Sequence, residues 1–350
     1  MNINVFLATF TAGYVITALL VPLNIRFSRR FGLIDIPHAR GIHNKDIPLA
    51  GGLSFGITLI LLQTAFFVLH SRNILEINNG DKLIYLALGC LLMMILGVLD
   101  DKREFTARYK LIFQIAIVCL MYFWGFRMEI LTNPFGSEIY LGVFSFPMTV
   151  LWFILVINAF NLIDGLDGLA SGIASIVALV LFIVGLLFHN DFVAMMSIML
   201  LSVNLAFLRF NFFPARIFMG DTGSMILGLC IAAISVAGTG QYKGITTMTL
   251  LVPVIVLILP LSDTILAVYR RAKHRKHIFL ADKQHIHHKL LELGYSQKTI
   301  ALFSYAVTIL FGLIALGFSF APKNILFLVL IIVAIILIII GYLLIKGIKK

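Results

Sequence analysis

The stretch FLVLIIVAIILIIIGYLLI, residues Phe327–Ile345, contains no charged side chain. A helix of about 20 apolar residues spans the hydrocarbon core of a bilayer, so this stretch predicts a transmembrane helix. The composition agrees, because 61% of the 350 residues are hydrophobic, only 12% are charged and the mean hydropathy is +1.04. A typical soluble domain is about half apolar and a quarter charged. The sequence therefore predicts an all-α, polytopic integral membrane protein.

Hydropathy along the chain predicts eleven transmembrane helices. The first has its basic residues after the apolar run, whereas a signal peptide has them before it, so we expect a retained span. The three cysteines lie singly inside apolar runs, which argues against a disulfide framework and against a thiolate metal site. The predicted ranges are 3–25, 49–69, 82–99, 109–126, 146–160, 169–189, 192–209, 222–238, 246–269, 299–319 and 324–345.

Lys and Arg are distributed unevenly between the two sets of connections. Of the 27 Lys and Arg residues, 22 lie in, or at the ends of, the connections after odd-numbered spans and the C-terminal tail. Because cytoplasmic connections carry the excess of positive charge, we expect the N-terminus outside and the C-terminus in the cytoplasm. The net charge of +11 then mainly reflects the orientation of the chain in the membrane, and the basic connections also attract anionic lipid. We expect no nucleic-acid binding.

Five aspartates stand at the predicted cytoplasmic ends of apolar spans. Two of them, Asp100 and Asp101, follow the third span. Carboxylates are poorly placed at the carboxyl end of a helix unless a cation compensates, and Lys102 and Arg103 are the neighbouring candidates. A solvated helix end with local ion pairs is the alternative interpretation.

The segment NAFNLIDGLDGLASG, residues 158–172, carries two more aspartates. Asp164 and Asp167 share a face with Asn161 if the segment is helical, and the interleaved glycines let a ligand approach the backbone closely. Capping of the next helix is an alternative that needs only one aspartate. An EF-hand does not fit, because its ligand-rich loop and final Glu are missing.

Two further segments carry polar residues on the predicted cytoplasmic side. NFFPARIFMGDTGS, residues 211–224, brings Asn211 and Asp221 to the start of the eighth span, where Asp221 is either a helix cap or part of a phosphate site. The most basic connection holds His285, His287 and His288. A zinc pair is an alternative there, although further His or Cys partners are missing.

Several carboxylates at one membrane face repel one another unless a divalent cation lies among them. Oxygen ligands alone favour Mg²⁺ or Mn²⁺ over zinc. Arg, Lys and His in the same connections suit a substrate that carries phosphates, so the pattern predicts phosphoryl transfer to or from a lipid. A divalent-cation transporter is the alternative of another class, but it needs ionisable groups near the midplane and a path to both sides.

Together these motifs resemble the polyprenyl-phosphate N-acetylhexosamine-1-phosphate transferase superfamily, glycosyltransferase family 4. The resemblance covers about residues 35–295. The separated histidines and the eleven spans are similar to its N-acetylglucosamine branch, and the phospho-N-acetylmuramoyl-pentapeptide branch of peptidoglycan synthesis is the alternative. Five segments carry the resemblance in order, namely RGIHNKDIPLAGGL, LGVLDDKREF, NAFNLIDGLDGLASG, NFFPARIFMGDTGS and HIHHKLLELGYS.

The resemblance implies one membrane-embedded transferase domain over residues 1–350, in a bacterial cytoplasmic membrane. It implies transfer of N-acetylglucosamine-1-phosphate from UDP-GlcNAc to undecaprenyl phosphate, the first membrane step of a cell-envelope glycan such as teichoic acid or O-antigen. Mg²⁺, or Mn²⁺ in its place, is the implied cofactor, and the resemblance allows a homodimer. The implied active site lies on the cytoplasmic connections 26–48, 100–110, 158–168, 209–222 and 270–298.

The resemblance also implies residue roles. Asp100, Asp101 and Asp221 are the expected catalytic residues, with Asp101 and Asp221 as metal ligands. Asp167 is the expected contact to uracil. The full set of expected substrate-binding residues is Asn161, Asp164, Asp167, Asn211, His287, His288, Arg40 and His43.

Overall fold

The computed structural model describes residues 2–35, 46–131, 139–237, 290–291 and 293–317, and the single positions 328, 331 and 335. The predicted ninth span lies outside these residues, and so does the eleventh except for the three single positions. Of the predicted site residues, Arg40, His43, His287 and His288 lie outside them too.

The described chain is mostly helical and forms a polytopic membrane protein. Eight helices are long and apolar enough to cross a membrane, and α4 is shorter at 17 residues. Each predicted span from the first to the eighth, and the tenth, coincides with one helix. These helices are α1 (Ile3–Phe31), α2 (Gly51–Ser71), α3 (Lys82–Arg103), α4 (Ala107–Phe123), α5 (Ser145–Ile163), α6 (Leu169–Leu187), α7 (Asp191–Asn211), α8 (Gly220–Ala237) and α12 (Gln297–Gly317).

Two short antiparallel hairpins interrupt the helices and depart from the all-α prediction. One joins β1 (Ile34–Asp35) to β2 (Ile47–Pro48), with Ile34 opposite Pro48. The other joins β3 (Ile130–Leu131) to β4 (Ile139–Tyr140) and precedes the short 3₁₀ helix η1 (Gly142–Phe144).

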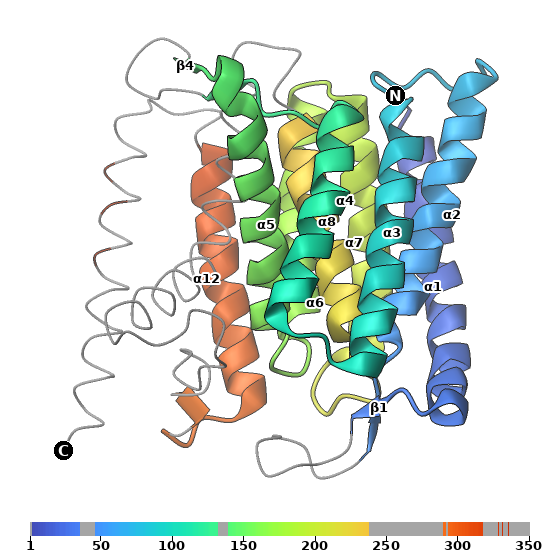
Figure 1. Ribbon diagram of the computed structural model, residues 1–350, viewed down its shortest axis with the longest axis vertical. Helices are drawn as coiled ribbons and strands as arrows, with labels where there is room; N and C mark the ends of the chain where they lie inside the picture. The colour runs from blue at the N-terminus through green and yellow to red at the C-terminus, as the bar shows by residue number, and fades with distance from the viewer. Residues whose placement is uncertain are drawn as a thin grey trace.

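The helices form a bundle with α7 and α8 at its centre (Figure 1). Within the most apolar window of each helix, 89% of α8 and 83% of α7 are buried, against 28% of α1. The sequence of α8 explains its central place, because its many Gly, Ala and Ser residues let neighbouring backbones approach closely. At Gly228, for example, a Cβ would lie 2.4 Å from the Cα of Ile157 in α5.

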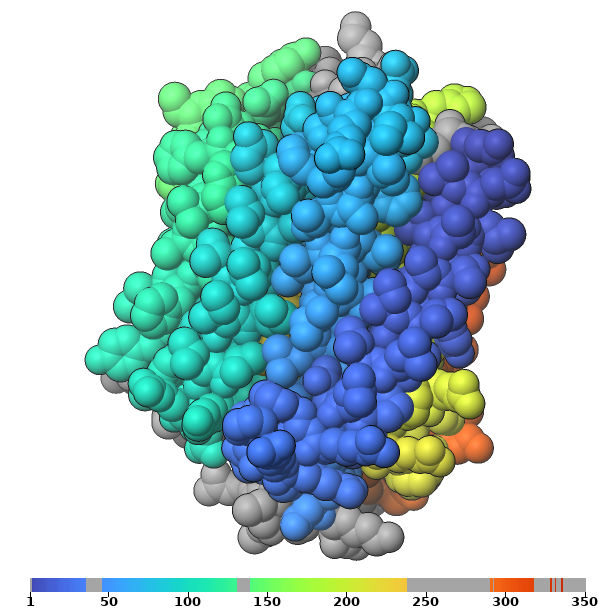
Figure 2. Space-filling model, turned by 90° about the vertical axis from the view of Figure 1, so that its right-hand side faces the viewer, coloured from blue at the N-terminus to red at the C-terminus, as the bar shows by residue number. Residues whose placement is uncertain are grey.

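Helix α1 packs on the bundle through small and polar residues on one face. A Cβ at Gly13 would lie 2.1 Å from the hydroxyl of Ser202 in α7, and the Thr17 hydroxyl donates to the Thr58 hydroxyl of α2 at 3.0 Å. Figure 2 shows α1 running obliquely beside α2. Nearer its carboxyl end, the Ser28 hydroxyl accepts a bond from Ala50 N at 3.2 Å, which holds the start of α2 against α1.

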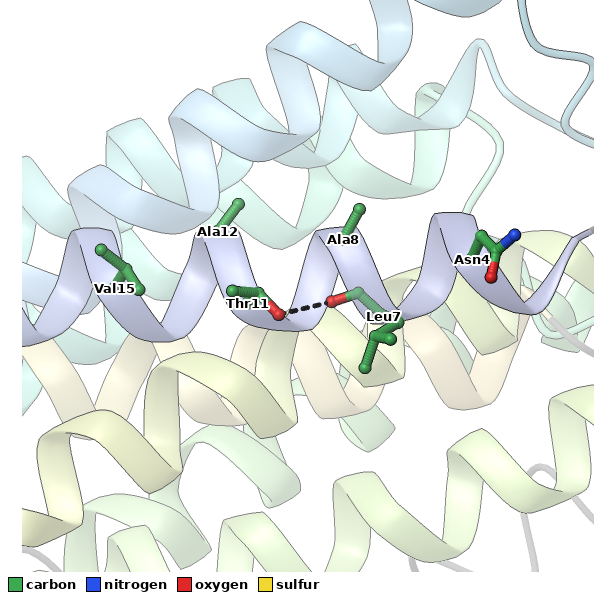
Figure 3. A pocket seen from close by; sticks show the side chains of 6 residues that line it. All are labelled: Asn4, Leu7, Ala8, Thr11, Ala12 and Val15. Carbon is green, nitrogen blue, oxygen red and sulfur yellow. Dashed lines mark hydrogen bonds between the residues drawn. The ribbon is translucent and has the colours of Figure 1, made fainter.

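The opposite face of α1 carries a shallow hollow of about 610 Å³ (Figure 3). Asn4, Leu7, Ala8, Thr11, Ala12 and Val15 line it, and the Thr11 hydroxyl bonds to the Leu7 carbonyl of the same helix at 2.8 Å. Its lining is mostly apolar and comes from one helix. It lies in the half of α1 remote from Ser28, so it is separate from the carboxylates described next.

Candidate active site

The aspartate pair at the end of α3 lies inside the protein rather than at a solvated helix end. Asp100 is 4% exposed, and its Oδ1 accepts a bond from Phe105 N at 2.8 Å. This bond fixes the turn between α3 and α4, where Glu104 adopts a left-handed conformation at φ 49°. The alternative of a solvated end with local ion pairs is therefore wrong for Asp100.

Asp101 caps the first turn of α8. Its Oδ1 accepts a bond from Asp221 N at 2.7 Å, and its Oδ2 accepts bonds from Thr222 N at 3.2 Å and Thr222 Oγ1 at 2.6 Å. A carboxylate is favoured there, because the first amides of a helix lack internal partners and carry partial positive charge. Asp101 is unfavourable at the carboxyl end of α3, but its side chain lies at the amino end of α8, where a negative charge is favourable.

Lys110, in the first turn of α4, places one positive charge between two carboxylates of the site. Its Nζ lies 2.8 Å from Asp100 Oδ2 and 2.8 Å from Asp221 Oδ1, and it donates to Asn161 Oδ1 at 3.4 Å. The sequence had pointed to Lys102 and Arg103, which are exposed on the last turn of α3. The sequence did carry an indication for Lys110, because a cation in the first turn of an apolar span is energetically costly unless it pairs with an anion.

Asp221 is the more accessible carboxylate of the pair that Lys110 joins. Its side chain is 33% exposed, against 4% for Asp100. Asn161, at the end of α5, donates its amide to Asp221 Oδ1 and to Ser224 Oγ, the latter at 2.9 Å. Three helices, α4, α5 and α8, therefore hold the Asp221 side chain in place while leaving it open on one side.

Glycines bring these helices close enough for the contacts to form. A Cβ at Gly97 of α3 would lie 2.3 Å from Thr222 Cα, and a Cβ at Gly52 of α2 would lie 2.2 Å from Gly223 N. Gly220 has a φ of +67°, and a Cβ there would meet the carboxylate of Asp101 at 2.8 Å. The start of α8 therefore fits between α2 and α3 only with these small residues.

Asp164 and Asp167 lie in the turn between α5 and α6, not on a helical face. The N-cap of α6 is Gly168, without a side-chain capping bond, so the interpretation that one aspartate caps α6 is wrong. Asp167 Oδ2 accepts a bond from Ala215 N at 2.9 Å, which ties this turn to the connection before α8. Burial raises the pKa of Asp164 well above its usual range, and the nearby carboxylates of Asp221, Asp101 and Asp167 raise it further.

Asn211, at the end of α7, is 2% exposed. Its Oδ1 accepts a bond from Ser171 Oγ at 2.9 Å, and its Nδ2 donates to the Ile217 carbonyl at 3.0 Å. These bonds hold the connection between α7 and α8 against the start of α6. Its expected contact to substrate stays a prediction.

The donors at this site fit a magnesium ion that a substrate would help to hold. Among the residues that the structure describes, no three His, Cys, Asp or Glu side chains form a cluster that could hold a metal ion. Mg²⁺ does not need such a cluster, because it is usually bound by one or two carboxylates together with substrate phosphates and water. Asp221 supplies an accessible carboxylate, and the repulsion between the carboxyl groups around it, which raises the pKa of Asp164, favours a cation there.

Comparison with known proteins adds three relatives and one family model. Residues 83–239 match the model described as glycosyl transferase family 4. The chain is 33% identical to a Bacillus subtilis protein named probable undecaprenyl-phosphate N-acetylglucosaminyl 1-phosphate transferase, over 88% of this chain and 83% of that protein. It is 34% identical to a decaprenyl-phosphate N-acetylglucosaminephosphotransferase of Mycolicibacterium smegmatis, over 82% and 75% of the two chains. It is 27% identical to the undecaprenyl-phosphate alpha-N-acetylglucosaminyl 1-phosphate transferase of Escherichia coli K12, over 92% and 87%.

Proposed function

The chain belongs to glycosyl transferase family 4, and from this membership and the carboxylate site we propose that it transfers N-acetylglucosamine-1-phosphate from UDP-GlcNAc to undecaprenyl phosphate. The products are undecaprenyl-diphospho-GlcNAc and UMP. The observation that carries the proposal is the partly exposed carboxylate of Asp221, which Lys110 and Asn161 hold at the start of a buried helix. The site faces the cytoplasm of a bacterial cell membrane, and the product begins a cell-envelope glycan.

Asp221 is the residue that would hold Mg²⁺, with Asp101 behind it. Bound there, the ion would offset the negative charge of the UDP diphosphate. Lys110 limits the repulsion between Asp100 and Asp221, so that a polyanionic substrate can enter beside them. Asp101 serves the site by fixing the start of α8, and hence the position of Asp221.

The lipid phosphate is the nucleophile. A phosphate monoester has a second pKa of about 6, so it is mostly dianionic at neutral pH and needs no general base. One of its oxygens forms a bond to the β-phosphorus while the bond from that phosphorus to the bridging oxygen breaks, and UMP leaves with that oxygen. Positioning and charge neutralisation then supply most of the acceleration.

Direct attack is favoured over an aspartyl-phosphate intermediate on Asp100. The side chain of Asp100 is 4% exposed, its Oδ1 accepts a bond from Phe105 N, and its Oδ2 forms an ion pair with Lys110. A nucleophile must come directly against the phosphorus, and the burial of this carboxylate opposes that approach. The stereochemical course at a chiral β-phosphorus tests this choice, because one displacement inverts the centre and two displacements retain it.

The turn that carries Asp164 and Asp167 is the proposed binding site for the nucleotide. It lies beside the Asp221 side chain, close enough for the charges of Asp221 and Asp101 to act on Asp164. Gly165 is exposed in the middle of the turn, so a ligand can approach its backbone.

A donor comparison with the purified protein tests the proposed function. Undecaprenyl phosphate, Mg²⁺ and either UDP-GlcNAc or UDP-MurNAc-pentapeptide are supplied, and UMP is measured. We expect UMP from UDP-GlcNAc only, and only when the polyprenyl phosphate is present. Release from UDP-MurNAc-pentapeptide alone would assign the chain to the peptidoglycan branch, and no release from either donor would contradict a transferase function.

A further inference from the structure

The proposed nucleotide-binding turn is held from outside by α12, a helix with no residue in the carboxylate site. The hydroxyl of Tyr305 in α12 donates to the Gly168 carbonyl at 2.6 Å. Gly168 is the last residue of the turn and the N-cap of α6, with a φ of +75°. The bond therefore acts at the joint between the turn and the helix that follows it.

Two glycines make the space that the Tyr305 ring fills. A Cβ at Gly172 would lie 2.1 Å from Cζ of Tyr305, and a Cβ at Gly168 would lie 3.2 Å from its hydroxyl. The Gly168 carbonyl also accepts the first amide bond of α6, from Gly172 N at 2.9 Å. The ring thus packs on the first turn of α6, whereas the hydroxyl adds a third bond to a carbonyl that already accepts from Gly172 N and, at 3.2 Å, from Ser171 Oγ.

A second side chain of α12 reaches the same turn. Oε1 of Gln297, in the first turn of α12, accepts a bond from Asp167 N at 3.5 Å. Asp167 in turn accepts the bond from Ala215 N described above. Tyr305 and Gln297 therefore contact the turn at adjacent residues, Gly168 and Asp167, and link it to the helix that begins at the end of the basic connection 270–298.

We propose that Tyr305 is a positioning residue for the nucleotide, acting through the backbone of the turn that carries Asp164 and Asp167. The inference rests on the proposed function, because it assigns the turn to UDP-GlcNAc. Since the Gly168 carbonyl keeps its bond from Gly172 N, loss of the Tyr305 hydroxyl leaves no buried group without a partner. Removal of the hydroxyl therefore loosens the turn with little cost to folding.

The test is Tyr305→Phe in the full-length protein, with kinetics measured separately for the two substrates. We expect KM for UDP-GlcNAc to rise about fivefold, the equivalent of one ordinary hydrogen bond, while KM for undecaprenyl phosphate and the Tm stay unchanged. Gln297→Ala should raise the same KM in the same direction. Tyr140→Phe, which removes a hydroxyl from the exposed β4 hairpin, is the matched control and should change neither KM.

The outcomes separate this inference from the proposed function. An active wild-type protein whose Tyr305→Phe variant keeps the wild-type KM for UDP-GlcNAc overturns the positioning role. Equal changes in both KM values together with a lower Tm also overturn it, because they indicate a structural role alone. If Tyr305→Phe does not fold, Gln297→Ala decides by the same criterion. A wild-type protein that releases no UMP contradicts the proposed function instead.

Discussion

Lys110→Met removes the positive charge that joins the two carboxylates of the site. The Nζ atom of Lys110 lies 2.8 Å from Asp100 and 2.8 Å from Asp221. At an effective dielectric constant of about 20, each contact corresponds to about 6 kcal/mol of Coulomb attraction. The cost of removing three charges from water offsets most of this, and loss of one partner of a buried ion pair usually costs about 3–5 kcal/mol.

The lower end of that range applies here, because the Asp221 side chain is 33% exposed and solvent screens its share of the attraction. We therefore expect Lys110→Met to lower the free energy of unfolding by about 3 kcal/mol in metal-free buffer. Turnover should fall about a hundredfold, the kinetic equivalent of a similar energy, because two unscreened carboxylates would then face the phosphates of the substrates.

Thermal unfolding in detergent measures the first effect, and UMP release at saturating substrates measures the second. Lys110→Arg should keep part of the activity, since it restores the charge with a different shape. Arg72→Met, which removes a charge from the exposed end of α2, is the control and should change neither quantity. A Lys110→Met protein that keeps half of the wild-type turnover would refute the reasoning.

Three further predictions concern the elements that hold the site. Asp101→Ala leaves the amides of Asp221 and Thr222 without their capping carboxylate. We expect the free energy of unfolding, measured by a thermal melt, to fall by about 2 kcal/mol. An unchanged melt would contradict the capping role. Gly97→Val would place side-chain atoms against Thr222, because a Cβ alone would lie 2.3 Å from Thr222 Cα. We expect the free energy of unfolding to fall by at least about 3 kcal/mol in the same measurement. Leu88→Val, on the exposed face of α3, is the control and should leave it unchanged. The raised pKa of Asp164 means that the folded state keeps the proton of this carboxyl at pH values above the unfolded pKa of about 3.9. The stability of the metal-free protein should therefore fall as pH rises through the folded pKa. Asp164→Asn should make this fall less steep, and an equal slope in the variant would contradict the role of Asp164.

Hydropathy located the described helices because it measures the property that a bilayer selects. It could not locate their ends, which depend on hydrogen bonds. Helix α1 continues to Phe31, past the predicted end at residue 25, and stops where Gly32 adopts a left-handed conformation at φ 71°. Arg29 and Arg30 lie in the last turn of this helix, where positive side chains are favourable because the carboxyl end of a helix carries partial negative charge. Hydropathy ends the span before them because charged side chains are unfavourable in lipid.

The family and the gathering of aspartates at one end of the bundle were predictable from motifs, and the relatives confirm the family. The partners of those aspartates were not predictable. Asp101 bonds to residues 120 and 121 positions away, and Lys110 joins Asp100 to Asp221 across two helices. Such contacts depend on the packing of Gly97 against Thr222, which local sequence does not reveal. The supposed helical face of Asp164 and Asp167 was wrong for a similar reason, since Asp167 bonds to Ala215 instead of following α5.

The central claim is that Asp221 is the residue through which this site transfers N-acetylglucosamine-1-phosphate. The most direct test compares wild-type protein with Asp221→Asn, a change that keeps the size of the side chain and removes its charge. UMP release from UDP-GlcNAc is measured with undecaprenyl phosphate at a series of Mg²⁺ concentrations, and folding is checked by a thermal melt. We predict Mg²⁺-dependent release by the wild type and none by a folded Asp221→Asn protein at any Mg²⁺ concentration. Near-normal release by that variant would contradict the account.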